Sequence, residues 1–151
     1  SHHPASTIPI LEINSHQITV IAGEAFGKNS PVEVFSKLFF VEVLLKPGKS
    51  LSFDPGPQET AFYILEGSVS LSGKTYPKDT FLILNKESIV EMEGEAKLIL
   101  FGGEPLSEDR HIYWNFVSSS KDKIEVAKNR WKEQSFAKIP GETEFIPLPK
   151  E

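Results

Sequence analysis

The sequence predicts an all-β domain, a closed antiparallel barrel, that is followed by one C-terminal helix. Short stretches in which apolar and polar residues alternate recur along residues 1–117, and turn signals separate them at regular spacing. The 151 residues include 11 prolines and 10 glycines, as suits a chain with many turns. Only the stretch after Ser118 has apolar residues at the spacing of a helix. A chain of this length predicts one globular domain.

The first elements are short strands. Residues 1–17 are expected to form an N-terminal linker or a leading strand segment, and we interpret their first four residues, SHHP, as a linker or tag remnant. ITVIAGEAFG (18–27) predicts a strand that ends in a glycine turn. KLFFVEVLL (37–45) has two largely apolar faces, which predicts a strand covered on both sides. Glu42, on one of these faces, is interpreted as pairing with a cation or reaching the barrel mouth, rather than as a buried base.

The remaining strands complete the predicted barrel, which we assign to residues 18–117. LSF (51–53) follows the turn PGKS, and residues 61–84 predict three strands separated by two turns. Val69 and Leu71 alternate with serines, as expected of a half-exposed strand. SIVEME (88–93) and AKLILF (96–101) predict two further strands joined by Gly94.

Residues 118–151 are predicted to form a helix and an extended tail. Ser119 and Asp122 have the Ser-x-x-Asp spacing that caps a helix start. Ile124, Ala127 and Trp131 form an apolar stripe, and Phe136 follows just beyond it. We expect this stripe to fold back on its own barrel rather than on a second copy, because the tail TEFIPLP lets the chain return.

Composition excludes several kinds of function. The absence of cysteine excludes disulfides, zinc–thiolate sites and thiol nucleophiles, and it is typical of intracellular proteins. A net charge of −5 disfavours direct binding to nucleic acid or to anionic membranes. The longest apolar run, residues 38–45, is too short to span a bilayer. Residues 118–138 are locally basic, which we interpret as a solvated face.

One loop has the spacing of a metal site. From Gly48 to Gly67 the chain matches the first motif of the cupin superfamily, in which two histidines and a glutamate bind metal, and a second motif of that superfamily adds a histidine. The corresponding positions here are Asp54, Gly56, Thr60 and Leu82. Glycine and leucine offer no donor atom and a threonine hydroxyl is a poor ligand, whereas a catalytic metal needs about three protein ligands. We therefore expect no metal-binding, cofactor-binding or catalytic residue in this chain.

Three longer segments resemble the C-terminal half of pirin and pirin-like proteins: IAGEAFG (21–27), GGEPLSEDRHIYWNFVSSS (102–120) and GETEFIPLP (141–149). The resemblance spans residues 18–149. It implies a cupin fold, a double-stranded β-helix or jelly-roll barrel, which packs face to face with an N-terminal barrel in one chain. In the family, three histidines and a glutamate of that N-terminal barrel hold iron, so iron is expected only there.

The resemblance also bears on activity and location. Family members are associated with quercetin 2,3-dioxygenase activity and, in eukaryotes, with nuclear transcription-cofactor roles. Nothing in this sequence corresponds to the iron barrel, so neither activity is carried over to a residue here. We expect a cytoplasmic location, or a nuclear one if the chain is eukaryotic.

Three functions remain open at this point. The first is a structural half that supports the N-terminal pirin barrel, binding it or a second copy through the helix face of Ile124, Trp131 and Phe136. The second is a stand-alone cupin that binds a small apolar or aromatic ligand. The third is a metal-independent isomerase that uses His111 with Asp109, Tyr113 or Tyr63. A crowded barrel interior favours the first, a hollow one the second, and a hollow one containing His111 and a tyrosine the third.

Overall fold

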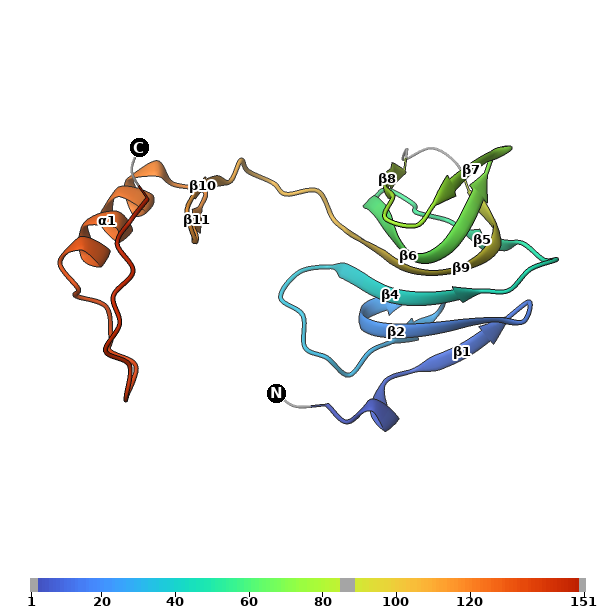
Figure 1. The fold of residues 1–151 in the computed structure, drawn as a ribbon, viewed down its shortest axis with the longest axis horizontal. Coiled ribbons are helices and arrows are strands. Elements are labelled where there is room, and N and C mark those ends of the chain that lie inside the picture. The colour runs from blue at the N-terminus through green and yellow to red at the C-terminus, as the bar shows by residue number, and fades with distance from the viewer. Residues whose placement is uncertain (1–2, 85–88, 150–151) are drawn as a thin grey trace. The chain divides into compact units, whose positions relative to one another are not determined.

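A computed structural model describes residues 3–84 and 89–149 of the chain. The chain divides into two compact units, Ser1–Pro105 and Leu106–Glu151, called here the first and second unit. Figure 1 shows strands throughout the first unit and a helix with a small hairpin in the second. The division falls between Pro105 and Leu106, whereas the sequence pattern assigned residues up to 117 to the barrel.

Within residues 3–84 and 89–105, the first unit contains one antiparallel sheet of nine strands. A short 3-10 turn, η1 (Ala5–Thr7), precedes them. The strands are β1 (Ile10–Ile13), β2 (His16–Ala25), β3 (Lys28–Asn29), β4 (Leu38–Leu45), β5 (Leu51–Phe53), β6 (Glu59–Leu71), β7 (Lys74–Pro77), β8 (Phe81–Leu84) and β9 (Val90–Gly103).

Two long strands close this sheet around a core. The path through the sheet is β1-β2-β4-β9-β6-β7, with β3 on β2, β5 on β9 and β8 on β6. The first half of β6 pairs with β8 and its second half with β7, while β9 pairs first with β5 and then with β4. The register shifts between Ile64 and Glu66, and such a bulge bends a strand. β6 and β9 are visibly curved in Figure 1, and the two ends of each strand therefore pair with different neighbouring strands.

The core follows from alternation along the strands. In β4 the odd-numbered residues from Phe39 to Leu45 are buried, and the even-numbered residues lie on the outer face. Inward side chains of the other strands meet them in one cluster, so the barrel holds a single hydrophobic core. Its buried members are Ile18, Val20, Ala25, Phe39, Val41, Val43, Leu45, Leu51, Phe53, Phe62, Ile64, Val69, Leu71, Leu84, Met92, Ala96, Leu98 and Leu100.

Gly94 does not separate two strands, contrary to the sequence-based expectation. β9 runs unbroken from Val90 to Gly103, and Gly94 lies opposite Val69 of β6. A side chain at Gly94 would meet the Ser68 carbonyl oxygen at 2.3 Å, so the glycine permits close strand contact rather than a turn. Ser88, where the predicted strand began, lies outside the described residues.

The second unit consists of the hairpin β10 (His111–Tyr113) and β11 (Phe116–Ser118) with the helix α1 (Lys121–Lys132). The helix begins one residue later than expected: Ser120, not Ser119, is the N-cap, and its hydroxyl oxygen accepts a hydrogen bond from the Lys123 N–H at 3.4 Å. Asp122 lies in the first turn, where its charge favours the helix dipole. No helix among the described residues is long and apolar enough to cross a membrane.

The predicted helix stripe is covered within the second unit. Ile124 is buried, and α1 contacts β10 and β11. The Trp131 ring lies 5.1 Å from that of Trp114 and 6.3 Å from that of Phe116, between centroids. The stripe thus docks on the hairpin that directly precedes the helix in sequence.

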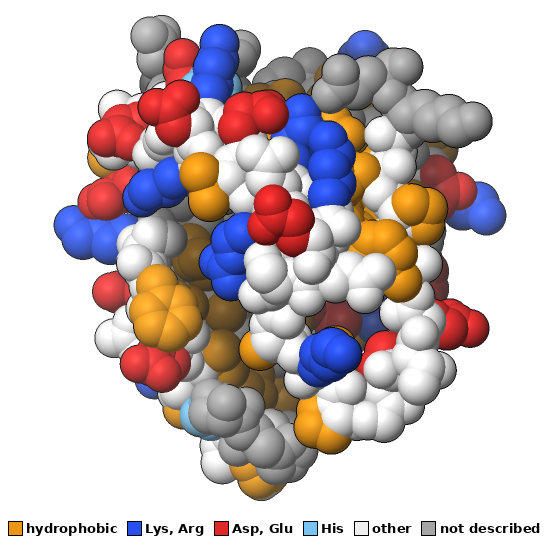
Figure 2. All heavy atoms as spheres, turned by 90° about the vertical axis from the view of Figure 1, so that its left-hand side faces the viewer, with side chains coloured by type: hydrophobic (Ala, Val, Ile, Leu, Met, Phe, Trp, Pro, Cys, Tyr) orange, Lys and Arg blue, Asp and Glu red, His pale blue; other side chains and the backbone are white. Residues whose placement is uncertain are grey.

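Acidic, basic and hydrophobic side chains intermingle on the face shown in Figure 2.

Candidate functional site

The loop with metal-site spacing lies in the first unit, and its aspartate serves the backbone. Asp54 follows β5, and its Oδ1 accepts a hydrogen bond from the Gly56 N–H at 2.8 Å. This is an Asx-type turn, a common local use of an aspartate before glycine. Gly56 itself has φ +54°, the left-handed conformation that glycine adopts at little cost.

Of the other two positions of the motif, one is buried and one packs against the core. Thr60 is buried in β6, and its hydroxyl contacts the Gln58 carbonyl oxygen at 3.5 Å. Leu82 of β8 lies opposite Phe62 of β6 and packs against the core. The four positions together present one carboxylate and one hydroxyl. Within residues 3–84 and 89–149, no group of three His, Asp or Glu side chains is placed to hold a metal ion.

Large side chains fill the interior of the barrel. Phe62, Leu51, Met92 and Leu98 are fully buried there. The Phe39 and Phe53 rings lie 5.5 Å apart, with Phe26 a further 5.4 Å from Phe53. Aromatic pairs at such distances are in direct contact. The interior is therefore crowded with phenylalanine and leucine.

Glu42 meets a cation, as the sequence interpretation expected. It lies on the outer face of β4, and its Oε2 is 2.9 Å from the Lys97 Nζ of β9. The Glu42 carboxylate raises the pKa of Lys97 above its ordinary value, first through the hydrogen bond and then through its charge. Glu42 is thus half of a cross-strand ion pair.

His111 lies in β10 of the second unit, opposite Ser118 of β11. Tyr113, two residues along the same strand, donates its hydroxyl hydrogen to the Pro149 carbonyl oxygen at 3.2 Å. Tyr63 belongs to β6 of the first unit and donates to Asp79 Oδ1 at 3.1 Å. That hydrogen bond is the main cause of a raised pKa at Tyr63. Each tyrosine hydroxyl thus has a partner other than His111.

His16 is a buried histidine that the sequence interpretation did not single out. Its ring lies inside the first unit at the start of β2, and Nδ1 accepts a hydrogen bond from the Lys46 N–H at 3.0 Å. The contact ties the β1–β2 turn to the turn after β4. Nε2 has no hydrogen-bond partner among the described residues. Nothing in its local sequence marks His16 as buried.

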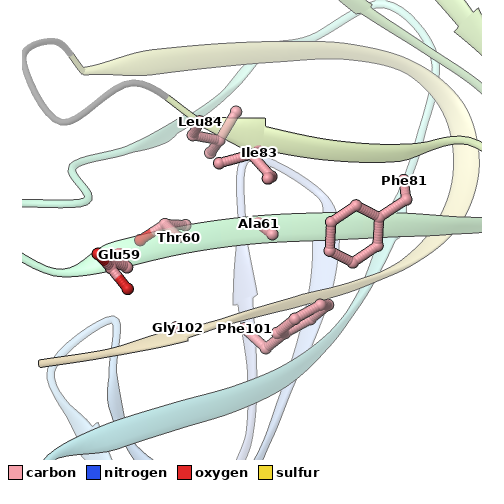
Figure 3. A pocket seen from close by; sticks show the side chains of 8 residues that line it. All are labelled: Glu59, Thr60, Ala61, Phe81, Ile83, Leu84, Phe101 and Gly102. Atoms are coloured by element: carbon pink, nitrogen blue, oxygen red, sulfur yellow. The ribbon is translucent and has the colours of Figure 1, made fainter. Parts of the chain in front are cut away.

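A hollow of about 530 Å³ lies on the outer face of the barrel (Figure 3). The side chains of Phe81 and Phe101 form one side of it, and Ile83 and Ala61 lie beside them. Phe81 is 55% exposed and Ile83 is 73% exposed, although both are large and apolar. Glu59 and Thr60 lie at the other end of the hollow.

A row of phenylalanines extends from this hollow across the sheet. The rings of Phe81 (β8) and Phe101 (β9) are 5.8 Å apart, and that of Phe40 (β4) is 6.2 Å from Phe101. We call these three residues the phenylalanine row. One feature of the sequence indicated part of this row: both faces of residues 37–45 are largely apolar. It could not show that β9 and β8 would add rings to the same face.

A second hollow, of about 720 Å³, lies beside the loop that joins β3 to β4. Gly23, Glu24 and Asn29 line one part of it and Val34, Phe35 and Lys37 another. Phe35 is 93% exposed. The lining mixes backbone, apolar and single charged groups, which gives no chemical signature for a ligand.

Comparison with known proteins agrees with this architecture. The family model of the pirin C-terminal cupin domain matches residues 40–137. A pirin-like protein of Caulobacter vibrioides is 38% identical over 153 residues, which cover 99% of this chain and 52% of that protein. Pirin-like protein 2 of Arabidopsis thaliana is 30% identical over 138 residues, covering 80% of this chain and 42% of that protein.

A solved structure supports the same fold. The crystal structure of quercetin 2,3-dioxygenase from Acinetobacter baumannii superposes with a TM-score of 0.80 at 26% identity, covering 88% of this chain and 49% of that one. With the family match, it confirms the predicted all-β cupin barrel with one helix. The chain spans about half the length of the curated relatives that it matches.

Proposed function

The chain belongs to the pirin C-terminal cupin domain family, and on that premise we propose that it is the metal-free, structural half of a two-barrel protein. In this role it docks on a metal-bearing barrel and supports it. The other half of that protein resembles an iron-dependent quercetin 2,3-dioxygenase or a transcription cofactor. Any oxygenase chemistry belongs to that half.

The crowded barrel interior is the observation that carries this proposal. Phe39, Phe53 and Phe62 belong to the hydrophobic core of the barrel, and the Phe39 and Phe53 rings are in contact there. At the motif positions, the Asp54 carboxylate is engaged by its own turn, and Leu82 is part of the core packing. A redox metal needs several nitrogen or oxygen donors that converge, and these positions supply one carboxylate.

The phenylalanine row supports the docking part of the proposal. Soluble proteins seldom leave several aromatic rings together on a sheet face unless another surface covers them. The row lies on a face whose strands β4 and β9 carry apolar residues on both sides, as strands do in sheets covered on both faces. We therefore assign this face to the partner barrel.

This assignment differs from the helix face that the sequence suggested as the docking surface. Ile124 is buried, and Trp131 and Phe136 contact each other and Phe116 inside the second unit. These contacts engage part of the helix face within the second unit. Ile112 and Val117 of the hairpin are among the exposed apolar side chains that this unit offers a partner barrel or a second copy.

A second candidate function is the binding of a small apolar or aromatic ligand. The hollow beside Phe81 and Phe101 favours it, because its volume of about 530 Å³ falls within the range of small-molecule sites. In this alternative the site lies on the outer face and not inside the barrel. The substitution Phe81→Ser separates the two candidates. It weakens binding of the partner barrel under the first candidate and binding of the small ligand under the second.

The test is binding to a surrogate partner, the half of the Caulobacter vibrioides pirin-like protein outside the matched region. We expect this chain to bind it, and Phe81→Ser to weaken binding about tenfold or more, since an aromatic ring at an interface centre is a typical hot spot. Phe35→Ser is the matched control, because it removes an exposed ring of the same unit outside the row. Equal binding by the wild type and Phe81→Ser, measured by calorimetry, contradicts the docking surface.

A further inference from the structure

The C-terminal tail lies across an aromatic surface of the second unit. The Trp131 indole Nε1–H of α1 donates a hydrogen bond to the Ile146 carbonyl oxygen at 2.8 Å. The Tyr113 hydroxyl of β10 donates to the Pro149 carbonyl oxygen at 3.2 Å. Two aromatic donors from different elements thus bind two carbonyls that lie three residues apart. We call Tyr113 and Trp131 the aromatic platform.

The platform is held in place by its own surroundings and not by the tail alone. Trp131 contacts the Trp114 ring at 5.1 Å and the Phe136 ring at 6.0 Å, between centroids. The Lys128 ammonium lies 4.5 Å from the centre of the Tyr113 ring and 3.0 Å from Glu125 Oε1. A cation over an aromatic face is attractive, so Lys128 fixes the orientation of that ring. Both donor side chains are therefore held by contacts other than those with the tail.

The tail has the chemistry of a polyproline ligand. Its sequence here is Phe145-Ile146-Pro147-Leu148-Pro149. Each proline fixes φ near −65°, lacks an N–H group and drives the preceding residue toward an extended conformation. Such a segment makes no hydrogen bonds of its own and presents its carbonyls outward. Aromatic-lined grooves recognise segments of this type in proline-rich peptide binding.

An aromatic anchor completes the contact. The Phe145 ring stacks on Trp131, with centroids 5.8 Å apart and planes 27° apart. A hollow of about 410 Å³, lined in part by Trp131, Phe136 and Ile139, borders the same ring. The platform thus joins an aromatic subsite to two carbonyl-binding donors, in the order aromatic-x-Pro-x-Pro.

The tail covers this surface only lightly. Phe145 is 43% exposed and Ile146 is 63% exposed, and the segment contacts the platform through two hydrogen bonds and one stack. A ligand held by so few contacts exchanges with a competitor of the same chemistry, provided that the competitor exceeds the local concentration of the tail.

We propose that the aromatic platform is a binding site for extended protein segments of the type aromatic-x-Pro-x-Pro, and that the chain's own tail is its intramolecular ligand. A partner protein carrying such a segment binds by displacing the tail. The proposal does not depend on the docking of the phenylalanine row, since all of its residues belong to the second unit.

The test uses the full-length chain and a capped synthetic peptide with the sequence of residues 142–149. The readout is the indole N–H resonance of Trp131 in a nitrogen-15 spectrum, which is assigned by its loss in Trp131→Phe; the chain has two tryptophans. The wild type is expected to bind the peptide weakly, because the tail competes. Phe145→Ser loosens the tail and is expected to tighten apparent binding about tenfold.

Three controls keep the test specific. Val126→Ala alters an exposed side chain of α1 that belongs neither to the platform nor to the tail, so it should leave binding as in the wild type. A peptide with both prolines replaced by alanine should bind markedly less. If Phe145→Ser disturbs folding, the double substitution Pro147→Ala with Pro149→Ala weakens the tail without changing the platform, and the same gain is expected.

The proposal is overturned by either of two results in a folded variant. One is the absence of any shift of the Trp131 resonance at saturating peptide in the loosened-tail variants. The other is equal binding of the peptide with and without its prolines, which reduces the contact to nonspecific apolar adhesion.

Discussion

At the scale of single residues, the stretch from Gly48 to Gly67 has the spacing of the cupin metal motif, and we propose that it binds no metal. Asp54, Gly56 and Thr60 stand where the cupin motif requires ligands, and each has an evident local role instead. Asp54 and Gly56 share a hydrogen bond within a turn, and Thr60 lies buried in β6. The buried threonine is tolerated because its hydroxyl has a backbone carbonyl within reach.

Residue chemistry therefore leads to a prediction about metal content. We expect the purified chain, freed of any tag, to contain far less than one iron, zinc, copper or nickel ion per molecule, because a single carboxylate holds such ions weakly. Elemental analysis by mass spectrometry measures this directly. A content near one metal per chain that disappears in Asp54→Ala would contradict the proposal of a metal-free barrel.

At the scale of elements, glycines decide where strands can approach one another. Gly67 in β6 has φ +74°, and a side chain there would lie 1.9 Å from the Glu95 carbonyl oxygen of β9. It follows the irregularity between Ile64 and Glu66, where β6 bends. Gly67 thus has a structural role that does not depend on a metal ligand.

The expected effect of Gly67→Ala is severe. The methyl group collides with a backbone atom, which cannot move without breaking the β6–β9 pairing, so a loss of more than about 3 kcal/mol in the free energy of unfolding is expected. Gly56→Ala is the matched control: it has a similar positive φ but open space around it, so only the left-handed strain of about 1 kcal/mol applies. Chemical denaturation compares them, and equal losses would refute the steric explanation.

The C-terminal end of α1 is a second feature at the scale of elements. α1 ends at Lys132, and Gln134, two residues beyond it, has φ +53°. The Ser135 N–H donates to the Arg130 carbonyl oxygen, and the Gln134 N–H donates to that of Trp131. This is a Schellman ending, a position that glycine usually fills. It turns the chain after the helix, and the tail then returns to the platform. Pro140-Gly141 and TEFIPLP predicted that the tail would return, but they did not predict that it would contact Trp131.

At the scale of the whole molecule, the two units differ in how much apolar surface they bury. Every buried hydrophobic residue among those described lies in the first unit, except Ile124. The second unit relies on a small, partly exposed aromatic cluster around Trp131. A compact unit of this size buries too little surface to be strongly stable alone.

Hydrogen exchange should separate the two units. We expect the amides of α1 to exchange through local opening at a much lower free energy than those of β6 and β9, whose opening requires unfolding of the barrel core. Mass spectrometry of peptides from both elements, under identical conditions, makes the comparison. Protection of α1 equal to that of the slowest strand amides would show that the second unit is stabilised by contacts beyond its own cluster.

The sequence by itself determined much of the barrel. Alternation fixes which residues of a strand share a face, so it separated the two faces of β4 and identified the half-exposed Val69 and Leu71 region. It did not show that only the odd-numbered face of β4 is buried, because both faces are largely apolar in sequence. Donor chemistry at Asp54, Gly56, Thr60 and Leu82 can likewise be judged without coordinates. The pairing of Glu42 with a cation was expected because an isolated charge on an apolar face needs a partner.

Only the tertiary structure decided how distant segments share a surface. The phenylalanine row joins Phe40, Phe81 and Phe101, whose alignment depends on strand register and not on any local pattern. The continuity of β9 through Gly94 depends on its approach to β6, and the fully buried His16 on two turns meeting. The hydrogen bonds from Tyr113 and Trp131 to the tail likewise join residues that are 36 and 15 positions apart in sequence. Such contacts follow from the packing of the whole fold, because local preferences determine the conformation of each segment but not which segments meet.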